Sequence, residues 1–324
     1  MGACRLRLPT RATCVTVEPS AIAATLGGDR RRQRREVFWR LLFLGAAATS
    51  ILITLAIILS LAGEAWVFIS NVDLSSLWEI GWFPRRGMFD IRTIVTGTLL
   101  VAGIAMLVAT PLGLGAAMYL SEYARPRVRR ILKPALEILA GIPSVVLGYF
   151  ALTFITPEIL KAVFGNAIAG FNMLAAGIGV GILTIPLVAS IAEDSMRAVP
   201  LALREASYGL GASRMSTSVR VVFPAAISGI VAALIIGLSR AIGETMVVAI
   251  ASGATGGSLF SLNVLEPGQT MTAAMASLAI GSDQVRGDDY AFQSLFFVGL
   301  LLFLVTLVLN VLSERFVRRV RQRY

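Results

Sequence analysis

The chain alternates between long apolar stretches and shorter charged ones. Six apolar stretches are long enough to supply the ~20 residues with which a helix crosses the hydrocarbon core of a bilayer. They cover residues 41–69, 94–120, 135–156, 167–192, 225–250 and 292–313. Glycines and prolines interrupt the third and fourth stretches, at Gly141–Pro143 and Gly177–Pro186. Breaks of this kind are tolerated where helices pack on one another or line a cavity. The pattern predicts an all-α, polytopic membrane protein with six transmembrane helices.

Positive charge favours one orientation of these helices. Twenty-three of the 29 Lys and Arg residues lie before residue 41, within 119–134 or 193–224, or after residue 313, and five lie in the three alternate loops. The positive-inside rule therefore predicts that both termini and the 193–224 loop are cytoplasmic. Residues 1–36 have little apolar periodicity and are predicted to form a disordered cytoplasmic tail, which leaves 37–324 as the transmembrane domain.

Composition excludes several kinds of chemistry. Charged residues make up 15% of the chain and hydrophobic residues 56%, whereas soluble domains average about a quarter charged. There is no histidine, and Cys4 and Cys14 lie in the tail, so we expect no metal site and no catalytic site. Lys133 and Lys161 both follow leucine, so no GxxxxGK[ST] phosphate-binding loop is present. If ATP drives the protein, another polypeptide binds it. The arginines beside apolar stretches fit membrane topology and not nucleic acid.

The polar loop 200–224 contains the signals of two short helices. Pro200 suits an early helical position, and Gly211 suits a left-handed stop after Leu201–Leu210. Ser213 suits the N-cap of a second helix, and Pro224 is expected to open the next membrane span. The prediction is a compact helical knob that seats in the groove of a partner, with Ala206 and Gly209 leaving room for close contact. The alternative is an amphipathic loop lying on the membrane surface.

One arginine lies inside an apolar stretch. Arg240 and Glu244 are four residues apart, so they are expected to share a helical face and to pair. Ala233, Gly237 and Ala241 fall on the same face and admit a close neighbouring helix. An arginine within the membrane is costly and is by default a candidate functional residue.

Two interpretations of this arginine remain open. Its guanidinium offers a planar fork of donors to a passing anion, and Glu244 would neutralise it when no anion is present. Further donors would come from Ser239, Thr245 and a second membrane subunit. The alternative is a structural ion pair that locks helix packing.

Two stretches are expected on the outer side. The first, 70–93, lies near Trp66, Trp78 and Trp82, which suit the headgroup belt. The second, 252–291, contains a predicted short helix over Gln269–Ile280. It would be a shallow helix at the outer face, a surface that docks a partner, or an inert connector.

Several motifs together carry a family resemblance. Glu205-Ala206, Gly211, Val221 and Pro224 have the spacing of the EAA loop of ATP-binding-cassette (ABC) importer permeases, with mild departures at Ser207, Val221 and Phe223. The other motifs are Arg240–Met246, Glu137–Ser144, Gln269–Ala274 and Leu112–Tyr123. Over residues 37–324 the chain resembles the permeases of phosphate-specific ABC importers, and the C-type (PstC) more than the A-type.

The resemblance implies a type I ABC importer permease of MetI-like architecture in the cytoplasmic (inner) membrane. Expected partners are a PstA-type permease, ATPase subunits that hold ATP and Mg²⁺, membrane lipid, and an extracytoplasmic phosphate-binding protein. The chain itself would be a transport subunit without an ATPase site or a cofactor. The resemblance maps Glu205 and Gly211 onto the ATPase coupling loop, and Ala206 and Pro224, which match its spacing, are further candidate coupling residues. The resemblance associates Arg240 and Glu244 with the substrate pathway, to which Ser239 and Thr245 are added as candidate donors.

Two other functions stay open at this point. A permease for sulfate, molybdate or phosphonate would carry a similar arginine. A secondary transporter driven by an ion gradient would instead show inverted repeats with unwound half-helices. The broken stretches here do not form two convincing halves.

Overall fold

The computed structural model describes residues 30–73, 75–78, 81–253, 257–280 and 290–320. The chain divides into two units, residues 1–58 and 59–324. The described α-helices are α2 (Arg30–Asn71), α3 (Ile91–Met118), α4 (Pro126–Ala140), α5 (Ser144–Phe150), α6 (Lys161–Phe164), α7 (Met173–Arg197), α8 (Leu201–Gly209), α9 (Arg214–Thr217), α10 (Phe223–Ala225), α11 (Ile227–Ile242), α12 (Met246–Ala251), α13 (Met271–Ile280) and α14 (Ala291–Val320).

Shorter elements connect or extend these helices. The 3₁₀ turns are η1 (Ser76–Trp78), η2 (Pro84–Arg86) and η5 (Gly165–Ala167). The π-helical segments are η3 (Tyr119–Tyr123), η4 (Ala151–Leu160) and η6 (Ser218–Val222). The strands β1 (Trp82–Phe83) and β2 (Met88–Phe89) pair antiparallel, with Trp82 opposite Phe89.

The first unit contains the start of helix α2. The helix begins at Arg30, inside the stretch 1–36 that the sequence predicted to be disordered, whereas residues 1–29 lie outside the described residues. Its segment Arg34–Asn71 is long and apolar enough to cross a membrane. Leu41, Phe43 and Ile51 are among the apolar side chains that this helix exposes, as expected of a membrane-facing helix.

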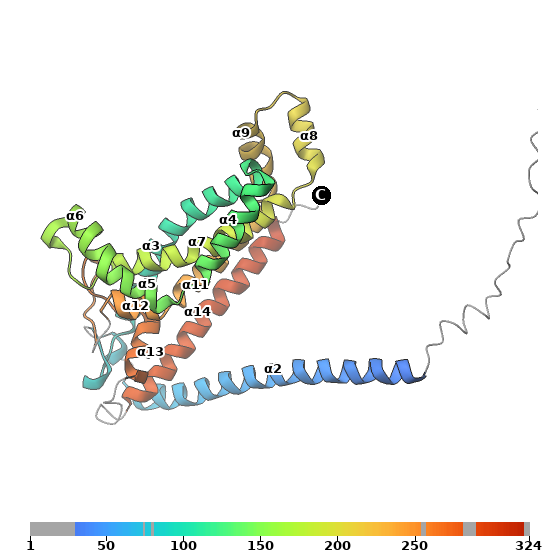
Figure 1. The fold of residues 1–324 in the computed structure, drawn as a ribbon. Helices are drawn as coiled ribbons and strands as arrows, with labels where there is room; N and C mark the ends of the chain where they lie inside the picture. The colour runs from blue at the N-terminus through green and yellow to red at the C-terminus, as the bar shows by residue number, and fades with distance from the viewer. Residues whose placement is uncertain (1–29, 74, 79–80, 254–256, 281–289, 321–324) are drawn as a thin grey trace, which may run out of the picture. The chain divides into compact units, whose positions relative to one another are not determined.

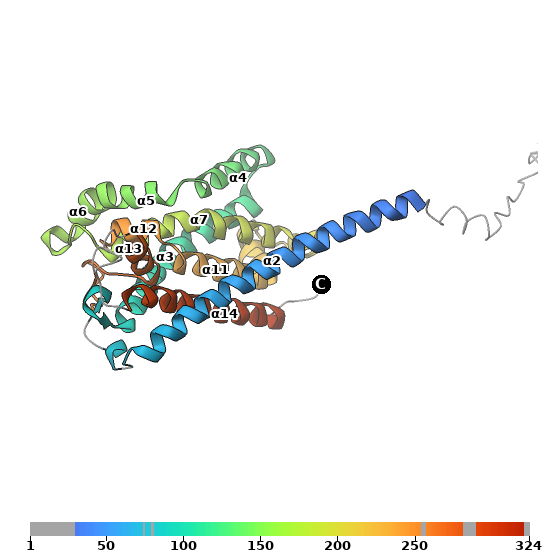
Figure 2. The ribbon, with the colours of Figure 1, turned by 90° about the horizontal axis from the view of Figure 1, so that it is seen from below.

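The second unit is built on four helices, α3, α7, α11 and α14, that run side by side (Figures 1 and 2). A Cβ atom added at Gly177 or Gly181 of α7 would lie 2.6 or 2.8 Å from a side-chain carbon of α3. The helix continues without a break through Pro186. The predicted interruption of the fourth stretch is therefore wrong, because its glycines admit a neighbouring helix closely and do not end the helix.

The predicted break of the third stretch at Gly141–Pro143 is confirmed, but the span has other bounds than expected, and the fifth stretch is bent where no break was predicted. α4 ends before Gly141 and Pro143, and the third span then runs from Ser144 to Ala167, not over 135–156. Helices Arg214–Ala225 and Ile227–Ile242 meet at an angle of 72°. Pro224 therefore lies before a bend and does not open the span. Five spans and this bent pair agree with the six transmembrane helices that the sequence predicts.

The two stretches expected on the outer side are partly buried. Trp82 of β1 is 1% exposed and packs against Phe89 of β2, so it does not belong to a headgroup belt, whereas Trp66 and Trp78 are exposed. The predicted short helix is present as α13. Its first residues, together with Gln269 and Thr270, are buried in the bundle, so this helix is not a shallow surface element.

Candidate functional site

The predicted knob consists of α8, α9 and η6, which project from one end of the bundle (Figure 1). Gly211 has a φ of +80°, and its amide donates to the carbonyl of Tyr208 across 2.9 Å. Ser213 accepts a hydrogen bond from the Ser216 amide and so caps α9. The expected stop and cap are both confirmed. Pro200 precedes the first helical residue and occupies the N-cap.

The tip of the knob is exposed and partly apolar. Leu210 is 89% exposed and Met215 60% exposed, and Glu205, Ala206 and Gly211 are exposed as well. The hydroxyls of Ser207 and Thr217 lie 2.9 Å apart and tie the two short helices together. The knob is thus a braced hairpin of helices with a free outer surface. Glu205, Ala206 and Gly211 lie together on it, and Pro224 follows at its base.

Arg204 fastens the base of the knob to the bundle. Its Nη2 donates to Glu122 Oε1 across 3.0 Å and to the Met196 carbonyl across 2.8 Å, and its Nη1 donates to the Val199 carbonyl. Glu122 lies in η3, at the end of α3, and its side chain is 6% exposed. One guanidinium therefore joins α8 to the ends of α3 and α7.

A second charged cluster joins α4 to α7. The Glu193 side chain is fully buried and accepts from Arg129 Nη2 at 2.8 Å and from Lys133 Nζ at 2.9 Å. Lys133 also contacts Asp194 at 2.6 Å. Burial alone would lower the pKa of Lys133, but its hydrogen bonds to Asp194 and Glu193 outweigh that effect and raise the pKa above its usual value. Lys133 is therefore charged at physiological pH.

Arg240 lies in the last turn of α11, and its side chain is exposed. It forms no hydrogen bond or ion pair with any described residue. On the same helix, Ala233, Gly237 and Ala241 are buried, and a Cβ atom at Gly237 would lie 2.8 Å from Val188 of α7. The small-residue face therefore packs as predicted and leaves the arginine on the surface of the subunit.

Glu244 does not pair with Arg240, contrary to the sequence expectation. The helix ends at Ile242, and Glu244 lies in the break before α12, where its side chain is buried. Its Oε1 accepts from the amides of Met246 and Val247 at 3.3 and 3.5 Å. A carboxylate at the start of a helix satisfies amides that have no partner within the helix. This role replaces the expected i,i+4 pair.

Other polar groups adjoin this break. Thr272 of α13 donates its hydroxyl to the Glu244 carbonyl across 2.7 Å, and Thr98 of α3 accepts from the Met271 amide across 3.0 Å. Ser239 donates to Asn310 of α14 across 3.1 Å. Thr245 is half-buried, and its hydroxyl donates to the Gly243 carbonyl across 3.4 Å. The Gln269–Ala274 motif is thus buried and hydrogen-bonded to the break between α11 and α12.

Sequence reasoning missed five residues with a part in these clusters: Glu122, Arg129, Glu193, Arg204 and Asn310. Arg129 and Arg204 indicated orientation and nothing more, and Glu122 and Glu193 were not singled out as site residues. Asn310 is a polar residue within an apolar span, and such residues mark buried or functional positions in membranes. That signal was available in the sequence.

A family model described as "Binding-protein-dependent transport system inner membrane component" matches residues 109–323. The phosphate transport system permease protein PstC of Mesorhizobium japonicum is 32% identical over 86% of this chain and 89% of that protein. The phosphate transport system permease protein PstC 1 of Mycobacterium tuberculosis is 36% identical over 73% of this chain and 75% of that protein.

Solved structures show the same fold. A chain from a bacterial alginate ABC transporter in complex with an alginate-bound periplasmic protein aligns with a TM-score of 0.63 and 15% identity, over 91% of this chain and 99% of that chain. A chain of the MetNI methionine ABC transporter in an inward-facing conformation aligns with a TM-score of 0.53 and 19% identity, over 72% and 96%. The predicted all-α, MetI-like architecture is confirmed.

Proposed function

Because the chain belongs to the family of binding-protein-dependent transport system inner membrane components, we propose that it is the PstC-type permease subunit of an ABC importer for inorganic phosphate. It resides in the cytoplasmic (inner) membrane. Phosphate as the solute follows from the two relatives, which are named phosphate transport system permease proteins. The chain aligns with them over 89% and 75% of their lengths.

The assignment of a substrate pathway rests on the position of Arg240 in α11. At about 1.5 Å of rise per residue, it lies about 20 Å along α11 from Ile227, past the middle of a ~30 Å hydrocarbon core. An exposed guanidinium at this depth needs water, an anion or a second subunit beside it. We assign it to the phosphate pathway, with Ser239 and Asn310 as neighbouring polar groups.

The knob supplies the link to the energy source. Glu205, Ala206 and Leu210 form an exposed surface that a groove in an ATPase subunit would cover. ATP and Mg²⁺ would bind on that subunit and not on this chain. The second permease would be of the PstA type, and an extracytoplasmic phosphate-binding protein would deliver the solute. The knob and both termini would face the cytoplasm.

Transport in proteoliposomes tests this proposal. The chain would be reconstituted with its ATPase, second permease and binding protein, and uptake of labelled phosphate would be measured with and without ATP. Arg240→Gln is expected to reduce uptake at least 100-fold while the subunits still co-purify, because the fork of donors is lost. Arg240→Lys is expected to retain part of the uptake, because it keeps the charge.

Arg127→Gln is the matched control, since Arg127 is exposed on α4 and far along the chain from the break. It should leave uptake unchanged. Normal uptake by Arg240→Gln would overturn the pathway assignment. Uptake of sulfate or molybdate in preference to phosphate would overturn the assignment of phosphate as the solute. Uptake that persists without ATP and collapses with an ionophore would indicate a secondary transporter.

A further inference from the structure

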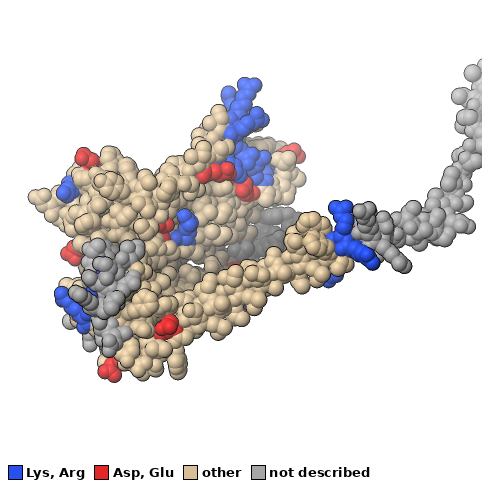
Figure 3. Space-filling model, turned by 60° about the horizontal axis from the view of Figure 1, so that its bottom comes forward, with Lys and Arg blue, Asp and Glu red and all other residues tan. Residues whose placement is uncertain are grey.

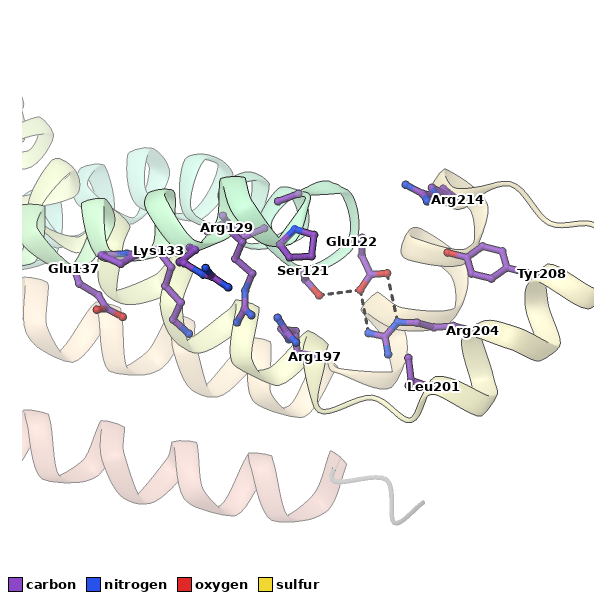
Figure 4. A pocket seen from close by; sticks show the side chains of 15 residues that line it. Ser121, Glu122, Arg129, Lys133, Glu137, Arg197, Leu201, Arg204, Tyr208 and Arg214 are labelled. Carbon is purple, nitrogen blue, oxygen red and sulfur yellow. Dashed lines mark hydrogen bonds and ion pairs between the residues drawn. The ribbon is translucent and has the colours of Figure 1, made fainter.

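A cleft of about 770 Å³ opens at the end of the second unit that carries the knob. It lies between η3, α4, the end of α7 and α8 (Figure 4). Figure 3 shows Lys and Arg side chains gathered at this end of the molecule. Six cationic side chains line the cleft: Arg129, Arg130, Lys133, Arg197, Arg204 and Arg214.

Positive charge exceeds negative charge in this cleft. Glu122 and Glu137 belong to its lining, and Glu193 and Asp194 pair with its cations. Six cations against four carboxylates leave an excess of two positive charges. Most of the cations contact these carboxylates, which hold them in place.

Two of the cations are available to a ligand. Arg130 of α4 and Arg214 of α9 form no side-chain hydrogen bond or ion pair with any described residue. Arg214 lies across the cleft from α4 (Figure 4). Arg130 and Arg214 thus line the cleft from two different elements, and two guanidinium groups can offer donors to the several oxygens of a phosphate group.

The cleft lies where two membrane spans end. The span of α3 and η3 ends at Tyr123, and the span of α7 ends at Arg197. Glu122 and Arg197, both in the last turn of a span, belong to the cleft wall. The ends of spans lie at the level of lipid headgroups. A ligand in this cleft is therefore at headgroup depth.

Helix α4 also exposes an apolar surface, whose residues do not line the cleft itself. Ile131 is 71% exposed and Ile138 73% exposed, and Leu139 is exposed next to them. They share one face of the helix, because their spacing is seven and eight residues. Arg129 and Lys133 lie on another face, toward α7. Arg130 lies between the two faces, about 100° around the helix from Ile131, so α4 carries the cations of the cleft and an exposed apolar stripe on different faces.

We propose that this cleft binds an anionic phospholipid. The phosphodiester group lies between Arg130 and Arg214, and the acyl chains lie along the Ile131–Ile138–Leu139 face. Basic pockets at helix ends bind anionic headgroups in this way. A volume of 770 Å³ suits a ligand of headgroup size, whereas a free phosphate ion would leave most of it to water. The exposed apolar face also favours the lipid, since inorganic phosphate makes no use of it.

The bound lipid would join α4 to the knob. Leu201, Tyr208 and Arg214 belong to the knob and line the cleft together with Arg130. A headgroup between Arg130 and Arg214 bridges the two elements, so it steadies the surface that we assign to ATPase coupling. The lipid site itself does not depend on which solute the protein carries.

Lipid titration of the full-length chain in detergent tests the proposal. Thermal unfolding would be followed while phosphatidylglycerol, phosphatidylcholine or inorganic phosphate is added. We expect saturable stabilisation by phosphatidylglycerol and little by the other two. The double variant Arg130→Gln/Arg214→Gln should weaken phosphatidylglycerol binding by at least tenfold, since charged hydrogen bonds contribute that much or more.

The matched control is Arg127→Gln/Arg220→Gln. It removes the same charge from α4 and from the knob, at two exposed residues that do not line the cleft. It should bind phosphatidylglycerol like the wild type. Equal losses in both double variants would overturn the site, because they would indicate attraction by the whole surface. Saturable stabilisation by inorganic phosphate that competes with the lipid would also overturn it, in favour of a free-anion site.

Discussion

Arg204 and Glu122 form a two-point contact between the knob and the end of α3. Arg204 Nη2 lies 3.0 Å from Glu122 Oε1, and its Nε lies 3.4 Å from Oε2. Their side chains are 12% and 6% exposed. Because the same guanidinium also donates to two carbonyls at the end of α7, a displacement of the knob must carry the ends of two membrane helices with it.

Arg204→Gln should therefore uncouple transport from ATP hydrolysis. The change leaves two carbonyls without the Arg204 donor and a nearly buried carboxylate with only the Ser121 hydroxyl, at a free-energy cost of about 2–3 kcal/mol. We expect phosphate uptake per ATP hydrolysed to fall several-fold. Arg220→Gln, at an exposed arginine of the same loop, should leave the ratio unchanged. A normal ratio in Arg204→Gln would show that the contact does not transmit movement.

Glu193 and Asp194 provide a matched pair of stability variants. Glu193→Gln removes a fully buried carboxylate from between Arg129 and Lys133 and should cost about 2–3 kcal/mol, less than a fully buried pair because both cations are about a quarter exposed. Asp194→Asn affects a side chain that is 61% exposed, so it should cost less than 1 kcal/mol. Thermal unfolding in detergent would measure both. Equal losses would contradict the buried bridge.

The pH dependence of the Lys133 contacts follows from its raised pKa. A lysine whose pKa is higher in the folded state contributes its full stabilisation below its unfolded pKa and loses it as the pH rises through the folded pKa. The contribution should therefore be constant at physiological pH and decline only in strong alkali. In Lys133→Met that alkaline decline should be smaller.

Gly97 and Gly103 of α3 test the packing of the Gln269–Ala274 motif. A Cβ atom at Gly97 would lie 2.3 Å from the Gln269 carbonyl oxygen, whereas nothing lies within 4 Å of one at Gly103. Gly97→Ala should destabilise the chain by about 1–3 kcal/mol. Gly103→Ala should be neutral or stabilise it by up to about 1 kcal/mol, because alanine favours a helix. The difference in melting temperature between these variants measures the close approach.

Two substitutions of Glu244 distinguish a helix cap from a counter-charge for Arg240. Glu244→Gln keeps an oxygen acceptor for the α12 amides, whereas Glu244→Ala removes it. If capping is the main role, Gln should lower stability by a few tenths of a kcal/mol and Ala by about 1 kcal/mol. The same ranking should hold for phosphate uptake. Equal loss of uptake in both variants would restore the counter-charge role.

Sequence by itself determined the elements that depend on local patterns. Apolar length predicted six spans, and Gly211 and Ser213 predicted the stop and the cap of the knob, because caps and turns are made by residues close in the chain. Arg240 could be identified as a candidate functional residue, because a charge within an apolar membrane-spanning stretch is costly.

The tertiary structure decided which irregularities break a helix and where the charges find partners. Gly177 and Gly181 sustain α7 because α3 packs against them, while the chain turns at Gly141 and Gly243. Glu244 does not pair with Arg240, four residues earlier, because helix α11 ends between them at Ile242. The contacts of Glu193 with Arg129 and of Glu122 with Arg204 join residues 64 and 82 positions apart, and only the packing of whole helices brings such residues together.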